Sequence, residues 1–128
     1  MRYALLLHNR EPAPGELPAE GIADMERLFA EYGDALVSAG VLVAAEVLQF
    51  SDATTTVTRR TGATQVQDGP FAETKEALAG IFVVDVPDAD AAIAWAEKCP
   101  GASYGSVEVR PVATSIVDGA WTAPGPAE

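Results

Sequence analysis

A chain of 128 residues is long enough for one folded domain but short for two, and its 48% hydrophobic content is typical of a globular protein. The net charge of −11 argues against nucleic acid as a partner, because phosphate binding needs clustered Lys and Arg, and the only adjacent basic pair is Arg59-Arg60. The same charge would be repelled by an anionic membrane surface, and no apolar run is long enough to cross a bilayer.

The chain contains a single cysteine, Cys99, and a single histidine, His8. One cysteine excludes an internal disulfide and fits a reducing compartment. Metal sites built from Cys and His are excluded for the same reason, and the carboxylates are not spaced as in a calcium loop. We expect no metal and no cofactor, and an oxygen-only site for magnesium or calcium is the alternative that stays open. The N-terminus lacks the pattern of a secretory signal, so a cytoplasmic location is expected, and the alanine-rich composition is typical of a GC-rich bacterial genome.

The first half of the chain predicts a strand, a loop and a helix. Residues 2–8 are nearly continuous in apolar side chains and predict a central strand, whereas residues 9–20 are rich in Pro, Gly and charge. Residues 21–39 predict an amphipathic helix that ends at Gly40. Its apolar positions recur at three and four residues: Ile22, Met25, Phe29, Tyr32, Leu36 and Ala39.

The second half predicts three further strands, a hairpin and one more helix. Residues 41–50 predict a strand, and residues 54–60 and 64–67 predict the two arms of a hairpin that precedes a break at residues 68–71. Residues 78–86 predict a buried strand. Asp88 is a favourable N-cap for a helix over residues 89–99. Residues 106–112 alternate apolar and charged side chains and predict the last strand.

This order is β-α-β, a hairpin insertion, then β-α-β. Two such units with right-handed crossovers predict an α+β, ferredoxin-like fold in which both helices cover one face of an antiparallel sheet. We expect the domain to span residues 1–113, with a loose C-terminal tail over residues 114–128.

The other face of that sheet predicts a homodimer. The first strand is apolar on both faces, since Ala4 and Leu6 alternate with Tyr3, Leu5 and Leu7. A soluble monomer rarely exposes so large an apolar patch, and face-to-face pairing of two copies would bury about 800 Å² on each. The alternative is that the tail, with Trp121, folds over this face.

One fifteen-residue stretch, residues 66–80, reads VQDGPFAETKEALAG and resembles the signature of the DGPF branch of the YCII-related proteins. The likeness extends over residues 1–113 and includes the late Glu108-Val109-Arg110-Pro111. The resemblance implies a dimeric α+β barrel. It also implies that relatives in the wider superfamily act on small aromatic molecules. Genes for DGPF proteins tend to lie beside genes for alternative sigma factors. Fold likeness alone does not select a reaction.

The chain departs from simpler YCII-related proteins at two positions. Those proteins resemble one another in a histidine at the start of the first helix and an Asp-Pro after the second. Here the helix start reads Pro18-Ala19-Glu20-Gly21, and Cys99 precedes Pro100. The acid/base pair proposed for that group is therefore missing.

Within the signature, Asp68, Lys75 and Glu76 are the candidate catalytic residues. A carboxylate beside an ammonium would stay ionised and could take part in acid/base chemistry. The alternative is structural: the Asp68 side chain would bond to nearby backbone N–H groups in a turn, and Lys75 and Glu76 would be solvated.

His8, Glu108 and Arg110 are the candidate ligand-binding residues. Glu108 and Arg110 are two apart on one strand and so share a face, where Arg110 could bind a carboxylate or phenolate through two hydrogen bonds. The alternative for this pair is a salt bridge across strands or across the dimer. Histidine is the side chain that ordinarily titrates near neutrality, so His8 could serve as a base at a pocket mouth, or it could be an ordinary histidine at a strand end.

Two functions from different classes follow. The first is a small-molecule-binding protein, with lyase or isomerase chemistry on an aromatic or anionic metabolite. The second is a regulatory partner whose acidic surface binds a basic protein such as an alternative sigma factor.

Overall fold

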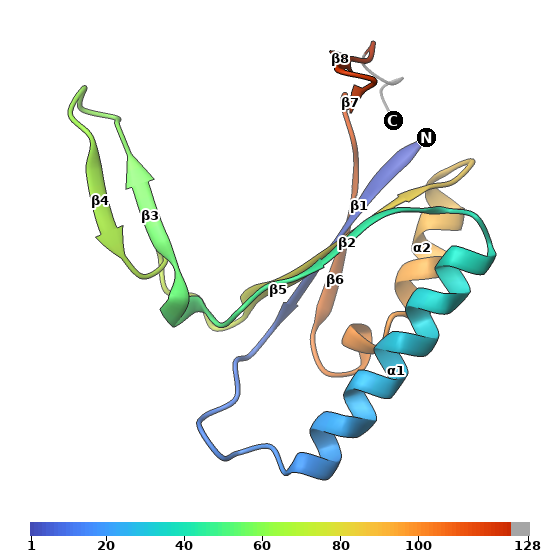
Figure 1. The fold of residues 1–128 in the computed structure, drawn as a ribbon, viewed down its shortest axis with the longest axis horizontal. Helices are drawn as coiled ribbons and strands as arrows, with labels where there is room; N and C mark the ends of the chain where they lie inside the picture. The colour runs from blue at the N-terminus through green and yellow to red at the C-terminus, as the bar shows by residue number, and fades with distance from the viewer. Residues whose placement is uncertain (124–128) are drawn as a thin grey trace.

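The computed structural model describes residues 1–123 and contains a four-stranded sheet, two helices and two small hairpins (Figure 1). The elements follow the predicted order. They are β1 (Arg2–Asn9), α1 (Ala19–Ser38), β2 (Leu42–Val47), the 3-10 turn η1 (Ser51–Ala53), β3 (Thr55–Thr58), β4 (Gln65–Asp68), β5 (Ala77–Asp85), α2 (Ala89–Lys98), the 3-10 turn η2 (Pro100–Ser103), β6 (Ser106–Pro111), β7 (Ile116–Val117) and β8 (Ala120–Trp121).

The main sheet has the strand order β2-β5-β1-β6, and every neighbouring pair is antiparallel. The strand that follows each helix is parallel to the strand before it and separated from it by one other strand. The two β-α-β units are therefore interleaved. The α+β class is confirmed, and the strand order is compatible with the predicted ferredoxin-like arrangement.

Local sequence signals set the helix ends where they were predicted. Gly40 adopts a φ of +71° after α1, a conformation that residues with a Cβ rarely adopt. The Asp88 side chain accepts a hydrogen bond of 2.9 Å from the backbone N–H of Ala91 and caps α2. Asp90 and Lys98 stand at the ends of α2 that favour their charges.

The core lies between the sheet and the helices. It contains alternate residues of β1 and β5, together with Tyr32 and Leu36 of α1 and small residues of α2. Full burial of one large apolar side chain contributes about 1.5–3 kcal/mol. The buried set is Tyr3, Leu5, Leu7, Tyr32, Leu36, Phe82, Val84, Val86, Ala92, Ala96 and Cys99.

The first half of α1 is less buried than the apolar stripe predicted. Tyr32 and Leu36 are buried and Phe29 is partly buried, but Ile22 is exposed. The loop over residues 10–18 carries the start of α1 beyond the end of the sheet (Figure 1). The stripe therefore has sheet beneath it only in its second half.

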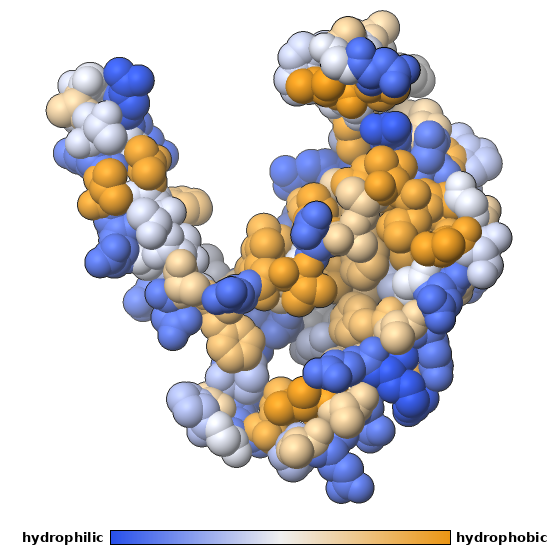
Figure 2. All heavy atoms as spheres, viewed as in Figure 1, coloured by the Kyte–Doolittle hydropathy of each residue, from blue (hydrophilic) through white to orange (hydrophobic). Residues whose placement is uncertain are grey.

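The predicted hairpin insertion is confirmed as β3 and β4, which form a separate two-stranded sheet. We call residues 55–68 the arm. The arm extends from the sheet on the side away from both helices, and open space separates it from the rest of the molecule (Figures 1 and 2).

A second small hairpin, β7–β8, lies within the segment predicted as a tail. Hydrogen bonds between Thr122 and both Thr114 and Ser115 close it. Trp121 is 68% exposed, so the alternative in which Trp121 covers the sheet is wrong for the single chain. The remainder of the predicted tail, residues 124–128, lies outside the described residues. Over residues 1–123, neither helix has the length and apolarity that a bilayer span requires.

Candidate functional site

The sheet face turned away from the helices remains uncovered in the single chain, and we call it the open face. Alternation along β1 sends Tyr3, Leu5 and Leu7 under the helices, which leaves the intervening residues on the open face. Residues paired across antiparallel strands share a face, so the register identifies the rest. The open face carries Ala4, Leu6 and His8 of β1, Ile81 and Val83 of β5, Ala44 and Glu46 of β2, and Glu108 and Arg110 of β6.

All three predicted ligand-binding residues meet on this face. The His8 Nε2 atom lies 2.6 Å from Glu108 Oε1, and the second Glu108 oxygen lies 3.5 Å from an Arg110 guanidinium nitrogen. Glu108 stands opposite Leu6 and is therefore a diagonal neighbour of His8, which is close enough for long side chains to touch. One carboxylate thus bridges an imidazole and a guanidinium.

The contact between His8 and Glu108 is short but is not a well-aligned hydrogen bond. The Nε2 atom is buried and lacks a partner with hydrogen-bond geometry, although the Glu108 oxygen is within contact distance. The pair becomes an ion pair only when the imidazole is protonated. Glu108 and Arg110 are more exposed than His8, so the polar group runs from a sheltered ring to an open guanidinium.

Gly105 sets the register that makes this contact. A Cβ on Gly105 would collide with the backbone carbonyl oxygen of His8, so only glycine permits β6 to begin this close to β1. The Gly105 N–H also donates to the carbonyl of Gly101 at 2.9 Å, which fixes the turn out of η2. Ser106 consequently stands opposite His8, and Glu108 follows two residues later.

The Asp68-Gly69-Pro70 turn closes the base of the arm through its backbone. Gly69 has a φ of +95° and donates its N–H to Thr54 O at 2.7 Å, while its carbonyl accepts from Thr56 Oγ1 at 2.8 Å. The Asp68 side chain is exposed, and among the described residues it makes no hydrogen bond or ion pair. The predicted bond from this carboxylate to turn N–H groups is therefore wrong. Asp68 is the last residue of β4 and stands opposite Thr55. The turn depends instead on the positive φ of Gly69.

Lys75 and Glu76 lie in the loop that leads from the arm into β5. Both side chains are exposed, and the contact that orders this loop is a 2.6 Å hydrogen bond from Thr74 Oγ1 to the carbonyl of Glu76. Ala77 follows directly and stands opposite Asn9, so the loop enters the sheet at the end where His8 lies. Among the described residues, no ion pair or hydrogen bond joins Asp68, Lys75 and Glu76 to the cluster of His8, Glu108 and Arg110.

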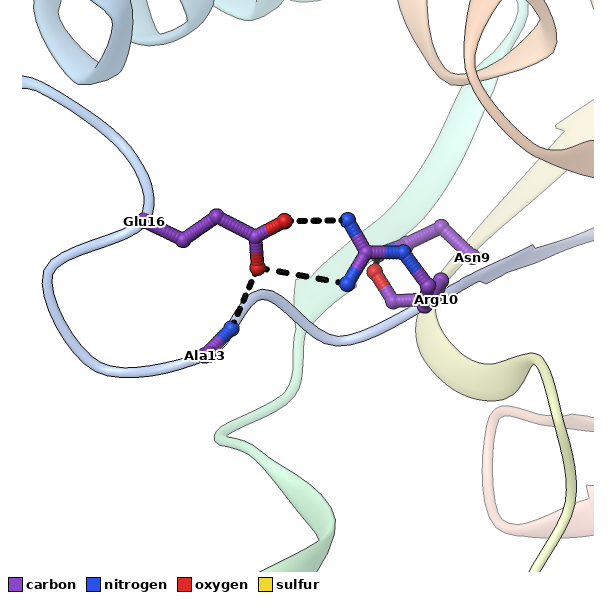
Figure 3. A network of polar contacts seen from close by, with 4 residues as sticks. All are labelled: Asn9, Arg10, Ala13 and Glu16. Carbon is purple, nitrogen blue, oxygen red and sulfur yellow. Dashed lines mark hydrogen bonds and ion pairs between the residues drawn. The ribbon is translucent and has the colours of Figure 1, made fainter.

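A polar network that the sequence did not indicate holds the loop after β1 (Figure 3). Arg10 donates two hydrogen bonds, of 3.2 and 2.5 Å, to the Glu16 carboxylate, which also accepts from Ala13 N at 2.6 Å. The bond from Arg10, followed by that from Ala13, lowers the pKa of Glu16. The same bond to Glu16 raises the pKa of Arg10. The neighbouring Glu11 accepts from Ser51 N at 2.6 Å and from the Ser51 hydroxyl, which ties this loop to the base of the arm.

Two shallow hollows of the chain lie away from this cluster. One, of about 180 Å³, is lined by Arg2, Val112 and residues of the β7–β8 hairpin. The other, of about 360 Å³, lies between α2, η2 and β6 on the helix side. Neither includes His8, Glu108 or Arg110. The cluster therefore stands on the exposed sheet face, outside both of these hollows.

Over the same described part of the chain, no group of three or more His, Cys, Asp or Glu side chains is placed to hold a metal ion. Cys99 is buried, and burial raises the pKa of its thiol, partly offset by hydrogen bonds from the Gly101 and Ala102 backbone. Neither observation adds a further reactive group to the open face.

Comparison with known proteins supports the resemblance drawn from the motif. The sequence model of the YCII-related domain matches residues 1–116. An uncharacterized protein of Rhizobium meliloti (strain 1021) is 36% identical over 115 residues, which cover 88% of this chain and 93% of that protein.

Proposed function

Because this chain belongs to the YCII-related family, we propose that it works as a homodimeric small-molecule-binding protein whose ligand lies on the open face. The ligand is an aromatic or other small anionic metabolite. Arg110 binds its anionic group, and a second copy of the chain closes the site from above. The bridge from His8 through Glu108 to Arg110, on an otherwise largely apolar and uncovered face, is the observation that carries this proposal.

The apolar part of the face supports an aromatic or otherwise partly apolar ligand. Ala4, Leu6, Ile81 and Val83 form a continuous floor across β1 and β5, because they pair across the two central strands. Binding sites for small molecules combine such a floor with a few polar groups that fix orientation. The cluster supplies those groups at one end of β1 and along β6.

The charges of the cluster support an anionic ligand. The Arg110 side chain is exposed and holds Glu108 by a single long contact of 3.5 Å, so its other N–H groups are open to a ligand. A planar guanidinium binds a carboxylate through two parallel hydrogen bonds. Glu108 would then restrain the His8 ring while Arg110 turns toward the ligand.

The chemical step belongs to the same proposal. His8 is the proposed proton donor and acceptor, because its imidazole lies on the open face with Nε2 2.6 Å from the Glu108 carboxylate. Asp68, Lys75 and Glu76 remain the proposed catalytic groups. Lys75 and Glu76 lie in the loop that enters the sheet beside the strand end that carries His8, and Asp68 ends β4 at the base of the arm. Proton abstraction and return by such groups is lyase or isomerase chemistry.

Binding of aromatic carboxylates tests the proposal. Benzoate and its hydroxylated analogues should raise the melting temperature of the wild type, because a ligand at a hundred times its Kd stabilises by about 2.7 kcal/mol. Arg110→Ala should weaken binding about 10- to 100-fold, the usual loss of a charge-assisted pair. The matched control is Arg27→Ala, which removes an exposed arginine of α1 that also pairs with a carboxylate.

The two variants separate the outcomes. If Arg110→Ala and Arg27→Ala bind equally well, the assignment of Arg110 is wrong. If none of these carboxylates stabilises the wild type, the proposed ligand class is wrong.

A further inference from the structure

The arm is a two-stranded hairpin, and no other element within residues 1–123 forms a layer behind it. Its two strands contact mainly each other. Val57 stands opposite Val66, and these two apolar side chains are 61% and 65% exposed. An isolated two-stranded hairpin is at best marginally stable in water. Within the described chain, the arm therefore lacks a packing partner for this apolar pair.

The tip of the arm carries two cations that make no ion pair with the part of the chain that the structure describes. Arg59 and Arg60 form the turn between β3 and β4, closed by a hydrogen bond of 3.0 Å from Gly62 N to Arg59 O. By contrast Arg10, Arg27 and Arg110 each pair with a carboxylate of the same chain. Neither Arg59 nor Arg60 forms an ion pair with any described residue. The tip is thus a concentrated positive charge on a protein whose net charge is −11.

The open face alone is small for a stable dimer. Four strands about 4.8 Å apart, each about six residues long at about 3.3 Å per residue, have a flat footprint on the order of 400 Å². A specific interface commonly buries about 800 Å² on each partner. The arm stands on the same side of the sheet as the open face and offers further area beside it (Figures 1 and 2).

From these observations we propose that the arm crosses to a second copy of this chain. Its Val57–Val66 face packs on that copy, and its Arg59-Arg60 tip meets carboxylates there. The inference rests on the homodimer of the proposed function. A second copy fits best because it would be seated on the adjoining open face, its surface is strongly acidic, and two-fold symmetry gives both arms the same docking site.

Cross-linking from the tip tests where the arm lies. A photo-reactive benzoylphenylalanine placed at Ala63, which is exposed at the tip, should give a covalent dimer on illumination. The same residue placed at Glu26, exposed on α1, is the control and should give little. Sedimentation velocity on the same samples records the oligomeric state independently of the cross-link.

Charge reversal tests what holds the tip. Arg59→Glu and Arg27→Glu each change the net charge by the same amount, one at the tip and one on α1. We expect Arg59→Glu to raise the dissociation constant of the dimer about tenfold or more, and Arg27→Glu to change it far less. Circular dichroism establishes that both variants fold.

The two proposals fail in different ways. A wild type that sediments as a monomer at every concentration overturns the homodimer and the arm together. A wild-type dimer without a cross-link from position 63, or with equal dissociation constants for the two charge variants, overturns the arm inference and leaves the homodimer standing.

Discussion

Tyr32 joins α1, the sheet and α2 through one side chain. Its ring meets Phe82 and Trp95 edge to face, with centroids 5.3 and 6.3 Å apart. Its hydroxyl donates to the Trp95 carbonyl at 2.8 Å, so the buried oxygen has a partner. Burial raises the pKa of this phenol well above its ordinary value of 10.0, because the ionised form would lose its hydration.

Tyr32→Phe should lower the free energy of unfolding by about 1 kcal/mol at pH 7, because the Trp95 carbonyl loses its donor. The difference from wild type should shrink above pH 10. The raised folded pKa means that the unfolded chain ionises first, so the wild type loses stability there while the Phe variant lacks this term. Urea unfolding at pH 7 and above pH 10 measures the difference in the free energy of unfolding between the two proteins. The control is Tyr104→Phe. The Tyr104 side chain is half exposed, and its hydroxyl makes no hydrogen bond to a described residue, so this substitution should change the free energy of unfolding little at pH 7. A gap that stays constant with pH would contradict the argument.

At the scale of single residues, the sequence predicted part of the candidate site. Glu108 and Arg110 are two residues apart, which predicted that they share one face of the strand, and the structure confirms this. The contact of Glu108 with His8 depends on the register of β6 against β1, which Gly105 sets through a close approach of two backbones. A close approach between residues nearly a hundred positions apart leaves no local pattern in the sequence. The roles given to Asp68, Lys75 and Glu76 stay predictions.

At the scale of elements, periodicity and end signals were sufficient for the main strands and both helices. Each signal is local. Strands repeat every two residues and helices every three to four, Asp88 caps the start of α2, and Gly40 ends α1. The position of an element in space is not local. The uncovered start of α1 and the separation of the arm both depend on loop paths, such as the one that Glu11 and Ser51 fix between two distant segments.

Gly69→Ala tests whether the DGPF turn holds the arm. Alanine at a φ of +95° is strained by about 1–2 kcal/mol, and Gly69 uses both backbone groups to close the arm. We expect faster hydrogen exchange of the β3 and β4 amides, with little change in β1 and β5, because the arm opens on its own. The matched control is Gly33→Ala in α1, where a Cβ meets no neighbouring atom and alanine should stabilise the helix by up to about 1 kcal/mol. Unchanged hydrogen exchange of the β3 and β4 amides would show that the turn does not stabilise the arm.

At the scale of the whole molecule, the helices cover one face of the sheet and nothing in the described chain covers the other. The core consequently lies on the helix side alone, and the candidate site stands on the uncovered face. A second copy seated on the open face would account for the arm on that side (Figure 1) and for the uncovered apolar residues of β1 and β5.

Ile81→Glu tests that arrangement at the middle of the open face. Ile81 stands opposite Leu6 on one side and Glu46 on the other, where solvent can reach a carboxylate in the monomer. In a face-to-face dimer the same carboxylate would be buried without a partner, at a cost of several kcal/mol. Sedimentation velocity should therefore find this variant monomeric and folded. Ile93→Glu, 45% exposed on α2 and so on the helix side, makes the same chemical change and should remain dimeric. A dimer that tolerates glutamate at position 81 as well as at position 93 would place the contact between copies elsewhere.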